Sequence, residues 1–233
     1  MSNLNIEYLK YDNDKFNFRK LFENFFKCDL TKLHEKFHIE KKNYDITAGI
    51  DNLSLVENAY KNVINSESFK DIWFSFINSV MKPYFNNEKI LIQKLPSINI
   101  IPSKCEVKYV HETVKGFNFH LDSYQPFYHP DFEENFWIPL TQTDELNDLY
   151  FLENNVKRRV DAKLNQIFRF GNDVVHGNMV KNNSKNTRIS MDFKALLSSN
   201  YDKNSISDKI IIKRGRQFKQ NEWYSTKHYY MEL

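Results

Sequence analysis

Gly116-Phe-Asn-Phe-His-Leu-Asp122 is the stretch of the sequence on which the predicted fold depends. We interpret it as a short β-strand, in which residues i and i+2 point to the same face. His120 and Asp122 would then project together, while Leu121 would point to the opposite face. An imidazole and a carboxylate on one strand face can supply two ligands of a metal site, so we expect a third ligand, another histidine, farther along the chain.

His176 is the strongest candidate for that third ligand. It lies in Gly171-Asn-Asp-Val-Val-His-Gly-Asn178, at the end of an apolar strand and beside a small residue. Two histidines and one carboxylate, with open positions opposite, form a metal site typical of non-haem Fe(II) oxygenases. The alternative is a histidine that is only packed in the core or exposed. A second pair, His129-Pro-Asp131, favours a loop, because proline fixes φ and has no N–H to donate.

Arg188 and Ser190 form an anion-binding pattern twelve residues beyond the candidate histidine. In the segment Asn186-Thr-Arg-Ile-Ser-Met-Asp-Phe193, the period of a strand places both side chains on one face. A guanidinium and a hydroxyl can together bind the far end of a small dicarboxylate, because the fork of arginine matches the geometry of a carboxylate. The alternative is a surface ion pair of Arg188 with Asp192 or Glu153.

The rest of the chain divides by composition into a helical part and a strand-rich part. We expect helices over about 15–38, divided by a break near 29–31, and over 54–64 and 66–84, with Asp14 capping the first, because apolar residues recur there at three- and four-residue steps. After Tyr84, β-branched and aromatic runs separated by turn residues predict short strands. The expected strands are 90–93, 98–101, 106–110, 116–121, 135–140, 149–152, 166–170, 174–176 and 188–193.

This order of elements predicts an α+β fold. We expect a double-stranded β-helix, a cupin-like jelly roll, over residues 86–196, with the helices of residues 1–85 packed on one sheet. Residues 197–233 are expected to add edge strands, including 210–216 and 222–224, whose basic residues protect an exposed sheet edge. With five Gly and six Pro in 233 residues and no flexible linker, we expect a single domain over 1–233.

Composition narrows the classes of partner and compartment. The net charge of +3 mixes acids and bases, which makes no case for nucleic acid. No apolar run approaches the length of a membrane span, and the N-terminal residues lack the pattern of a signal peptide. The two cysteines, Cys28 and Cys105, have no metal-type spacing and fit thiols in a reducing cytosol. We therefore expect a cytoplasmic protein without a nucleic-acid or membrane partner.

Five segments in order resemble the Fe(II)/2-oxoglutarate-dependent dioxygenases, and within them the phytanoyl-hydroxylase-like branch. The narrowest resemblance is to the StrG-like oxygenases of streptomycin biosynthesis and carbohydrate gene clusters. It covers roughly residues 90–196 and rests on His120-Leu-Asp-Ser-Tyr124, His129-Pro130, Glu134-Asn-Phe-Trp-Ile-Pro-Leu-Thr141, His176-Gly-Asn178 and Thr187-Arg-Ile-Ser-Met-Asp-Phe193.

The resemblance implies a set of roles for particular residues. His120, Asp122 and His176 would hold Fe(II), and Arg188 with Ser190 would hold the distal carboxylate of 2-oxoglutarate, the cosubstrate used with O₂. Asn135 and Asn178 are further candidates for binding 2-oxoglutarate, although Asn135 could equally satisfy a neighbouring backbone group.

The resemblance also implies a small, carbohydrate-type substrate, such as a sugar-nucleotide, glycoside or aminoglycoside precursor, that is hydroxylated or desaturated with release of succinate and CO₂. Tyr124, His129 and Trp137 are candidate substrate contacts, since aromatic faces and neutral polar groups suit a hydroxyl-rich ring.

Two other functions are compatible with the same residues. The first is a cupin-like metal-dependent sugar epimerase or isomerase, which would use the metal without 2-oxoglutarate and leave Arg188 without a ligand. The second is a non-catalytic carbohydrate-binding jelly roll, which the three intact candidate metal ligands argue against. The sequence predicts neither the carbon attacked nor the oligomeric state.

Overall fold

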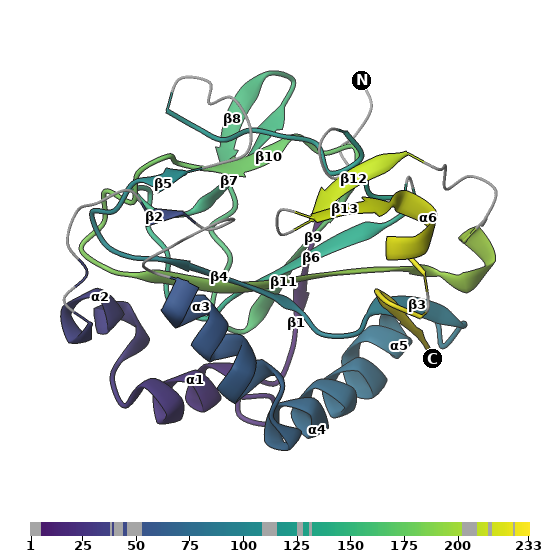
Figure 1. The fold of residues 1–233 in the computed structure, drawn as a ribbon, viewed down its shortest axis with the longest axis horizontal. Helices are drawn as coiled ribbons and strands as arrows, with labels where there is room; N and C mark the ends of the chain where they lie inside the picture. The colour runs from purple at the N-terminus through teal and green to yellow at the C-terminus, as the bar shows by residue number, and fades with distance from the viewer. Residues whose placement is uncertain are drawn as a thin grey trace.

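The chain is an α+β protein in which helices cover one face of an antiparallel sheet (Figure 1). The computed structural model describes residues 6–37, 39, 44–45, 53–108, 116–124, 128–130, 132–201, 209–213, 216–225 and 227–233. All statements about the structure below concern these residues. The α+β class expected from the sequence is confirmed.

The large sheet has seven strands and is organised around β11 (Arg188–Leu197). This ten-residue strand pairs along its length with β6 (Glu134–Pro139), β3 (Ile90–Gln93) and β4 (Ser97–Ile101). Beyond β6 lie β9 (Gln166–Gly171) and β1 (Ile6–Lys10), and beyond β3 lies β14 (Tyr230–Glu232). All of these pairings are antiparallel, so both halves of the sheet depend on the central strand.

A small sheet packs against the face of the large sheet that points away from the helices. It contains β10 (His176–Asn178), β7 (Leu149–Glu153) and β8 (Val156–Arg159), in that order. The contact is an apolar cluster that includes Leu149 and Phe151 from β7, Trp137 from β6, and Phe168 and Phe170 from β9. Two short strands, β2 (Tyr44–Asp45) and β5 (Val107–Lys108), pair in parallel.

Helices form a layer on the opposite face. They are α1 (Phe18–Phe26), α2 (Leu33–Lys36), α3 (Leu53–Ala59), α4 (Glu67–Phe76) and α5 (Lys82–Tyr84). The short helix α6 (Gln220–Trp223), near the C-terminus, lies on the other side of the large sheet, beside β13 (Figure 1). Leu30–Lys32 is a 3₁₀ turn, and Tyr60–Ile64 and Ile77–Met81 continue α3 and α4 with π-helical geometry. Ser66 caps α4 by accepting from Phe69 N, and Asn17, rather than the expected Asp14, caps α1.

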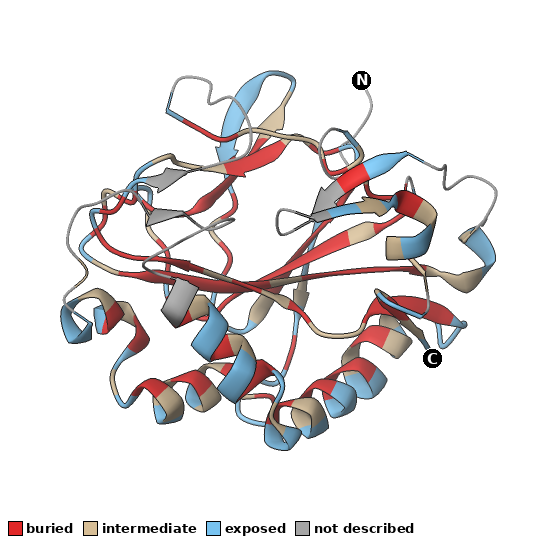
Figure 2. Ribbon diagram, viewed as in Figure 1, coloured by how far each residue is buried: buried red, intermediate tan, exposed pale blue. Residues whose placement is uncertain are grey.

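Aromatic packing joins the α1–α5 layer to β11. Phe193 packs edge-on against Trp73 of α4, with ring centroids 4.9 Å apart, and stacks on Phe136 of β6 at 5.1 Å. The odd-numbered residues of β11 from Ile189 to Ala195 belong to this core, which is seen as the buried layer between helices and sheet in Figure 2. The expected packing of N-terminal helices on one sheet is therefore confirmed, and the even-numbered residues of β11 face the other way.

Several sequence-based boundaries were wrong. Residues 116–121 do not form a regular strand but make isolated bridges at Phe117 and His120, because the segment pairs with β10 for only a few residues. Residues 222–224 lie at the end of α6 and in the turn after it, not in an edge strand.

The C-terminal strands take two different places in the fold. β14 is an edge strand of the large sheet, whereas β12 (Ile210–Lys213) and β13 (Arg216–Lys219) pair with each other.

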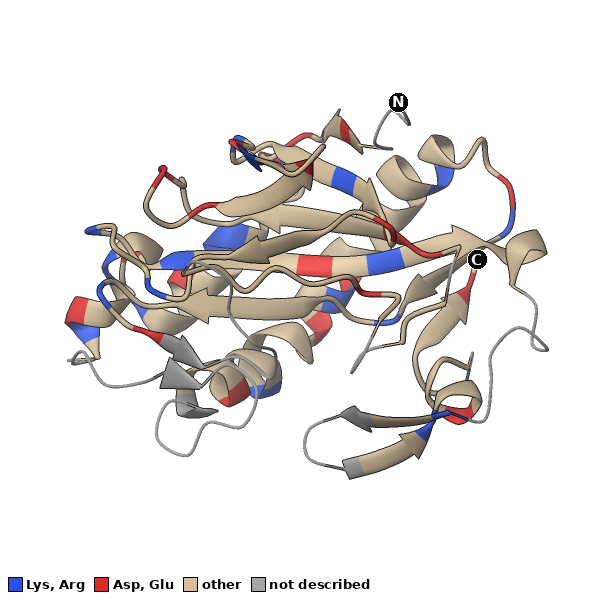
Figure 3. Ribbon diagram, turned by 90° about the horizontal axis from the view of Figure 1, so that it is seen from above, with Lys and Arg blue, Asp and Glu red and all other residues tan. Residues whose placement is uncertain are grey.

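Basic and acidic positions are interspersed over the described part of the chain (Figure 3). Among the helices that the structure describes, none combines the length and apolar character needed to cross a bilayer. Cys28 and Cys105 are both free thiols.

Candidate metal centre

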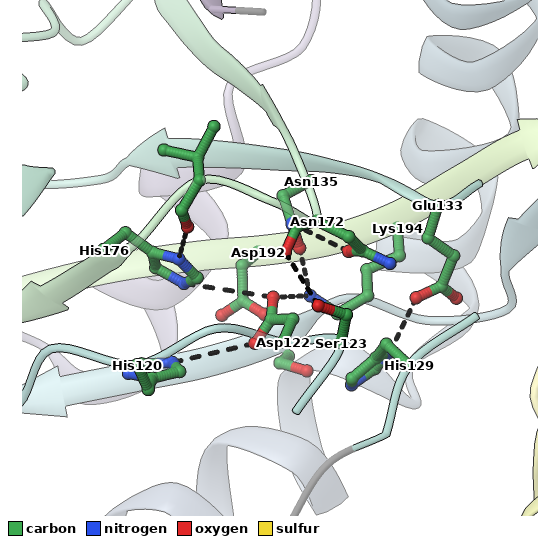
Figure 4. A network of polar contacts seen from close by, with 12 residues as sticks. His120, Asp122, Ser123, His129, Glu133, Asn135, Asn172, His176, Asp192 and Lys194 are labelled. Carbon is green, nitrogen blue, oxygen red and sulfur yellow. Dashed lines mark hydrogen bonds and ion pairs between the residues drawn. The ribbon is translucent and has the colours of Figure 1, made fainter. Parts of the chain in front are cut away.

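His120, Asp122 and His176 converge on one point between the two sheets (Figure 4). One ligand atom from each residue lies within 4.8 Å of the others. His120 Nε2 is 3.6 Å from Asp122 Oδ1, and His176 Nε2 is 3.9 Å from Asp122 Oδ2. Asp122 and His176 are buried and His120 is half-buried. The structure thus brings together the three residues that the sequence nominated as metal ligands.

The two histidines meet through a short backbone pairing. His120 N donates to His176 O at 2.9 Å, and His176 N donates to His120 O at 3.0 Å. Gly177 permits this close approach, because a Cβ at that position would lie 2.0 Å from the carbonyl oxygen of Asn118. The small residue beside His176 is therefore required by the distance between the two segments.

Hydrogen bonds at the far side of each ring fix the tautomer that a metal site needs. His120 Nδ1 lies 3.1 Å from Asn118 O, and His176 Nδ1 lies 3.0 Å from Val174 O. A carbonyl oxygen only accepts, so each Nδ1 carries the hydrogen and each Nε2 presents its lone pair toward Asp122. Burial, helped by the nearby His176, lowers the pKa of His120 to about 4, and burial also lowers the pKa of His176. Both imidazoles are neutral near pH 7, which fits a divalent cation.

Lys194, on β11, pairs with the carboxylate of the centre. Its Nζ lies 2.6 Å from Asp122 Oδ2, and both side chains are buried. Burial by itself would raise the pKa of Asp122, but the ammonium of Lys194, with smaller contributions from three histidines, holds it well below its usual range. Burial likewise disfavours the charged lysine, yet Asp122, Glu133 and Asp192 together raise the pKa of Lys194. The pair is therefore ionised at neutral pH.

Asn135 and Asn172 extend this contact into a buried polar network. Lys194 Nζ also donates to Asn135 Oδ1, and Asn135 Nδ2 donates to Asn172 Oδ1 at 3.2 Å. Asn172 Nδ2 donates in turn to the carbonyl oxygen of Pro130. The network connects β6, β11 and the loop that follows Asp122, and Asn135 contacts both Lys194 and Asn172 within it. A direct hydrogen bond from Asn135 to a cosubstrate stays a prediction.

Arg188 and Ser190 lie farther along the same face of β11. Arg188 is 1% exposed, which excludes the surface ion pair considered as an alternative. Its Nη1 donates to Asn178 Oδ1 at 2.5 Å and to Asn147 O at 3.3 Å. The guanidinium carbon also lies 5.7 Å from the ring centroid of Trp137. Ser190 Oγ is buried, and within the described part of the chain it has no hydrogen-bond partner.

Strand β10 connects the three candidate metal ligands with Arg188. His176 and Asn178 are two residues apart on one strand, so their side chains point to the same side with a separation of roughly 7 Å. Asn178 contacts Arg188, so the guanidinium lies beside the side chain two residues beyond His176 on β10. A five-carbon dicarboxylate has a length comparable to this span.

The three candidate substrate residues take different environments. Tyr124 follows the metal-ligand segment and is 68% exposed, so its ring is available at the surface. His129 is buried and pairs through Nδ1 with Glu133 Oε2 at 2.6 Å. Trp137 is buried in the cluster between the sheets. Contact of any of them with a substrate stays a prediction.

Sequence reasoning missed Lys194, Asn172 and Glu133. The period-two pattern of Arg188 and Ser190 continues through Asp192 to Lys194, so extending it by two more positions would have placed Lys194 on the same face.

The sequence is similar to a curated protein, the streptomycin biosynthesis protein StrG of Streptomyces griseus. The two are 29% identical over 140 residues, which make up 60% of this chain and 61% of StrG, so the match spans less than two thirds of that protein. No protein-family model matches the sequence.

Solved structures resemble the fold at lower similarity. AviO1 from Streptomyces viridochromogenes Tue57 is 10% identical, with a TM-score of 0.46 over 83% of this chain and 90% of that one. The non-heme alpha ketoglutarate dependent epimerase SnoN from nogalamycin biosynthesis is 10% identical, with a TM-score of 0.44 over 83% and 78% of the two chains. A nickel complex of the non-heme monooxygenase ThoJ gives 10% identity and a TM-score of 0.40 over 82% and 73%. At these scores the structural likeness carries no argument about activity.

Proposed function

We propose that this protein is an Fe(II)/2-oxoglutarate-dependent oxygenase. The observation that carries the proposal is the convergence of His120, Asp122 and His176, with both Nε2 lone pairs directed at the carboxylate. Two imidazoles and one carboxylate are the donor set of a non-haem Fe(II) site that keeps coordination positions open. Fe(II) bound there would supply the oxidising chemistry with O₂ and 2-oxoglutarate, yielding succinate and CO₂.

Arg188 and Ser190 support 2-oxoglutarate as the cosubstrate. The guanidinium contacts Asn178, which lies two residues beyond His176 on β10, and the buried Ser190 hydroxyl two residues from Arg188 on β11 lacks a partner among the described residues. A buried hydroxyl without a partner costs free energy unless a ligand supplies one. A dicarboxylate with one end at the metal would place its other carboxylate between these two groups.

The two sheets further support a jelly-roll, or double-stranded β-helix, core within a single domain. The large and small sheets pack face to face through the cluster that contains Trp137 and Phe151, and the site lies between them. In this arrangement the chain limits the access of water to the centre by burying Asp122 and His176, while Tyr124, two residues beyond Asp122 in the sequence, is exposed.

Replacing Arg188 tests the cosubstrate directly. Arg188→Met should raise the half-saturating concentration of 2-oxoglutarate roughly 10- to 150-fold, since a hydrogen bond to a charged group is worth about 1.5–3 kcal/mol. Metal affinity should change little. Arg158→Met is the matched control, because Arg158 lies on the exposed strand β8 and pairs with Glu153. An Arg188→Met protein with the 2-oxoglutarate affinity of wild type would refute this assignment.

We infer that the substrate is a small carbohydrate-type molecule, such as a sugar-nucleotide or glycoside. The similarity to a streptomycin biosynthesis protein and the exposed ring of Tyr124, two residues beyond Asp122 in the sequence, support this inference. Succinate formation by the iron-loaded protein should rise with a member of a sugar-nucleotide and glycoside panel, and Tyr124→Ala should lose that rise while keeping metal and 2-oxoglutarate binding. Stimulation by fatty acyl or amino-acid substrates alone would count against it.

A further inference from the structure

The buried lysine of the centre holds one of the two carboxylate oxygens of Asp122. Lys194 Nζ is 2.6 Å from Oδ2, whereas Oδ1 is the oxygen that approaches His120 Nε2, at 3.6 Å. Figure 4 shows the ammonium reaching Asp122 from β11, on the side away from His120. The two oxygens therefore differ: Oδ2 is engaged by the ammonium and lies 3.9 Å from His176 Nε2, whereas Oδ1 faces His120 Nε2.

The lysine itself is held in place by the surrounding network. Asn135 accepts from the same Nζ, and Asn135 is fixed in turn by Asn172. The backbone of Lys194 lies in the middle of the large sheet, where Lys194 of β11 is paired with Asn135 of β6. An ammonium with two buried oxygen partners on a central strand has little freedom to move, so its position relative to Asp122 is determined by the fold.

The contact between Lys194 and Asp122 affects the net charge that a bound 2-oxoglutarate would meet. The ammonium of Lys194 and the carboxylate of Asp122 lie 2.6 Å apart, so their opposite charges offset each other, and imidazoles that bind a metal through a lone pair add no charge. A divalent cation would then keep its full charge of +2, which a dianion such as 2-oxoglutarate balances. Without the lysine the same centre would carry one negative charge from Asp122, and the metal would be a weaker site for a dianion.

We propose that Lys194 is a positioning residue that binds Oδ2 of Asp122, leaves Oδ1 for the metal, and offsets the carboxylate charge so that the loaded centre binds a dianionic cosubstrate. This inference rests on the proposed function. Lys194 would then have opposite effects on the metal and on 2-oxoglutarate, because its ammonium opposes the binding of a cation and favours the binding of an anion. A lysine that only supported the fold would affect both ligands in the same direction.

The test uses the full-length protein and redox-inert Mn(II) and Co(II) in place of Fe(II). Calorimetric titration measures metal affinity first, and then 2-oxoglutarate affinity of the metal-loaded protein. Lys194→Met removes the charge and keeps the side-chain length. Lys70→Met is the control, since Lys70 is on the solvent side of α4 and pairs only with Glu67 in the described structure.

We expect Lys194→Met to bind Mn(II) at least as tightly as wild type and 2-oxoglutarate at least tenfold more weakly. The visible spectrum of the Co(II)-loaded variant should also change, because a carboxylate freed from the lysine can coordinate through both oxygens. Unchanged affinities for both ligands, or a parallel loss of both, would overturn the proposal.

A second variant keeps the test decisive if Lys194→Met does not fold. Lys194→Ala, assayed with and without ethylammonium chloride, should regain 2-oxoglutarate affinity with the alkylammonium but not with sodium chloride at equal ionic strength. Equal affinities in the two salts would contradict the role of the charge. If wild type binds metal but not 2-oxoglutarate, the proposed function fails instead, and the two failures are thereby distinguished.

Discussion

Breaking the ion pair between Asp122 and Lys194 in the metal-free protein should be costly, and removing both charges should cost no more than removing one. Each side chain is buried, with the charged atoms 2.6 Å apart. Removing one partner of a buried pair costs about 3–5 kcal/mol, because the other charge is left without compensation. For Asp122→Asn we expect the lower end, about 3 kcal/mol, since Glu133 and Asp192 also stabilise the ammonium.

The double variant provides the quantitative test. Lys194→Met alone should cost about 3 kcal/mol or more, and Asp122→Asn with Lys194→Met should cost about as much as one single change. The resulting coupling energy is about 3 kcal/mol, measured from urea unfolding of the chelator-treated proteins. The exposed pair of Glu67 and Lys70 is the control, and its coupling should be below about 1 kcal/mol.

Additive costs in the Asp122 and Lys194 cycle would refute the reasoning. They would mean that the carboxylate and the ammonium do not stabilise each other, and that their charges do not offset one another in the folded protein. Circular dichroism of each variant establishes that the native fold is being compared.

Two further perturbations probe the histidines. Burial lowers the pKa of His120 to about 4, so the unfolded chain binds this proton before the folded protein does as the pH falls. The contribution of neutral His120 to the stability of the metal-free protein is therefore complete above about pH 6.5. Roughly 3 kcal/mol of that stability is lost as the pH falls to about 4. His120→Gln should flatten that part of the pH–stability curve, and an unaltered curve would contradict the buried, neutral state. Gly177→Ala should push the two histidine segments apart, because the added Cβ would lie 2.0 Å from Asn118 O. Metal affinity should therefore fall at least tenfold in a calorimetric titration. A variant with wild-type metal affinity would show that the close approach of the segments is not needed.

Periodicity predicted most of the elements that position the site. The apolar steps that predicted a helix over 66–84 correspond to α4 and its continuation, in which Trp73 and Phe76 are buried against β11. The predicted strand 90–93 corresponds to β3, and the strand expected at 188–193 is the first part of β11. These segments were predictable because one face of each is buried in the apolar core.

The elements that were missed lack that signal. β8 (Val156–Arg159) is exposed at all four positions and carries three consecutive basic residues, so no apolar alternation marks it. β1 (Ile6–Lys10) is a partly exposed edge strand whose place is set by its pairing with β9, more than 150 residues away. Long-range pairing of this kind is not encoded in a local pattern.

The candidate site was predictable in part for a related reason. His120 and Asp122 were nominated by the geometry of a strand that the structure does not contain as a regular element. They converge nonetheless, because the backbone pairing of His120 with His176 holds the segment in an extended path. Lys194 was missed because a lysine at the end of an apolar strand is usually an exposed edge residue, and its burial depends on Asp122 and Asn135 from other segments.

Metal-dependent binding of 2-oxoglutarate tests the central claim most directly. Chelator-treated wild-type protein should bind one Mn(II) per chain, and 2-oxoglutarate should bind in a 1:1 ratio only after the metal is present. His176→Ala should lose both binding steps while retaining its circular dichroism spectrum. Binding of metal without any binding of 2-oxoglutarate would favour a metal-dependent epimerase or isomerase, and 2-oxoglutarate binding that needs neither metal nor His176 would contradict the proposed centre.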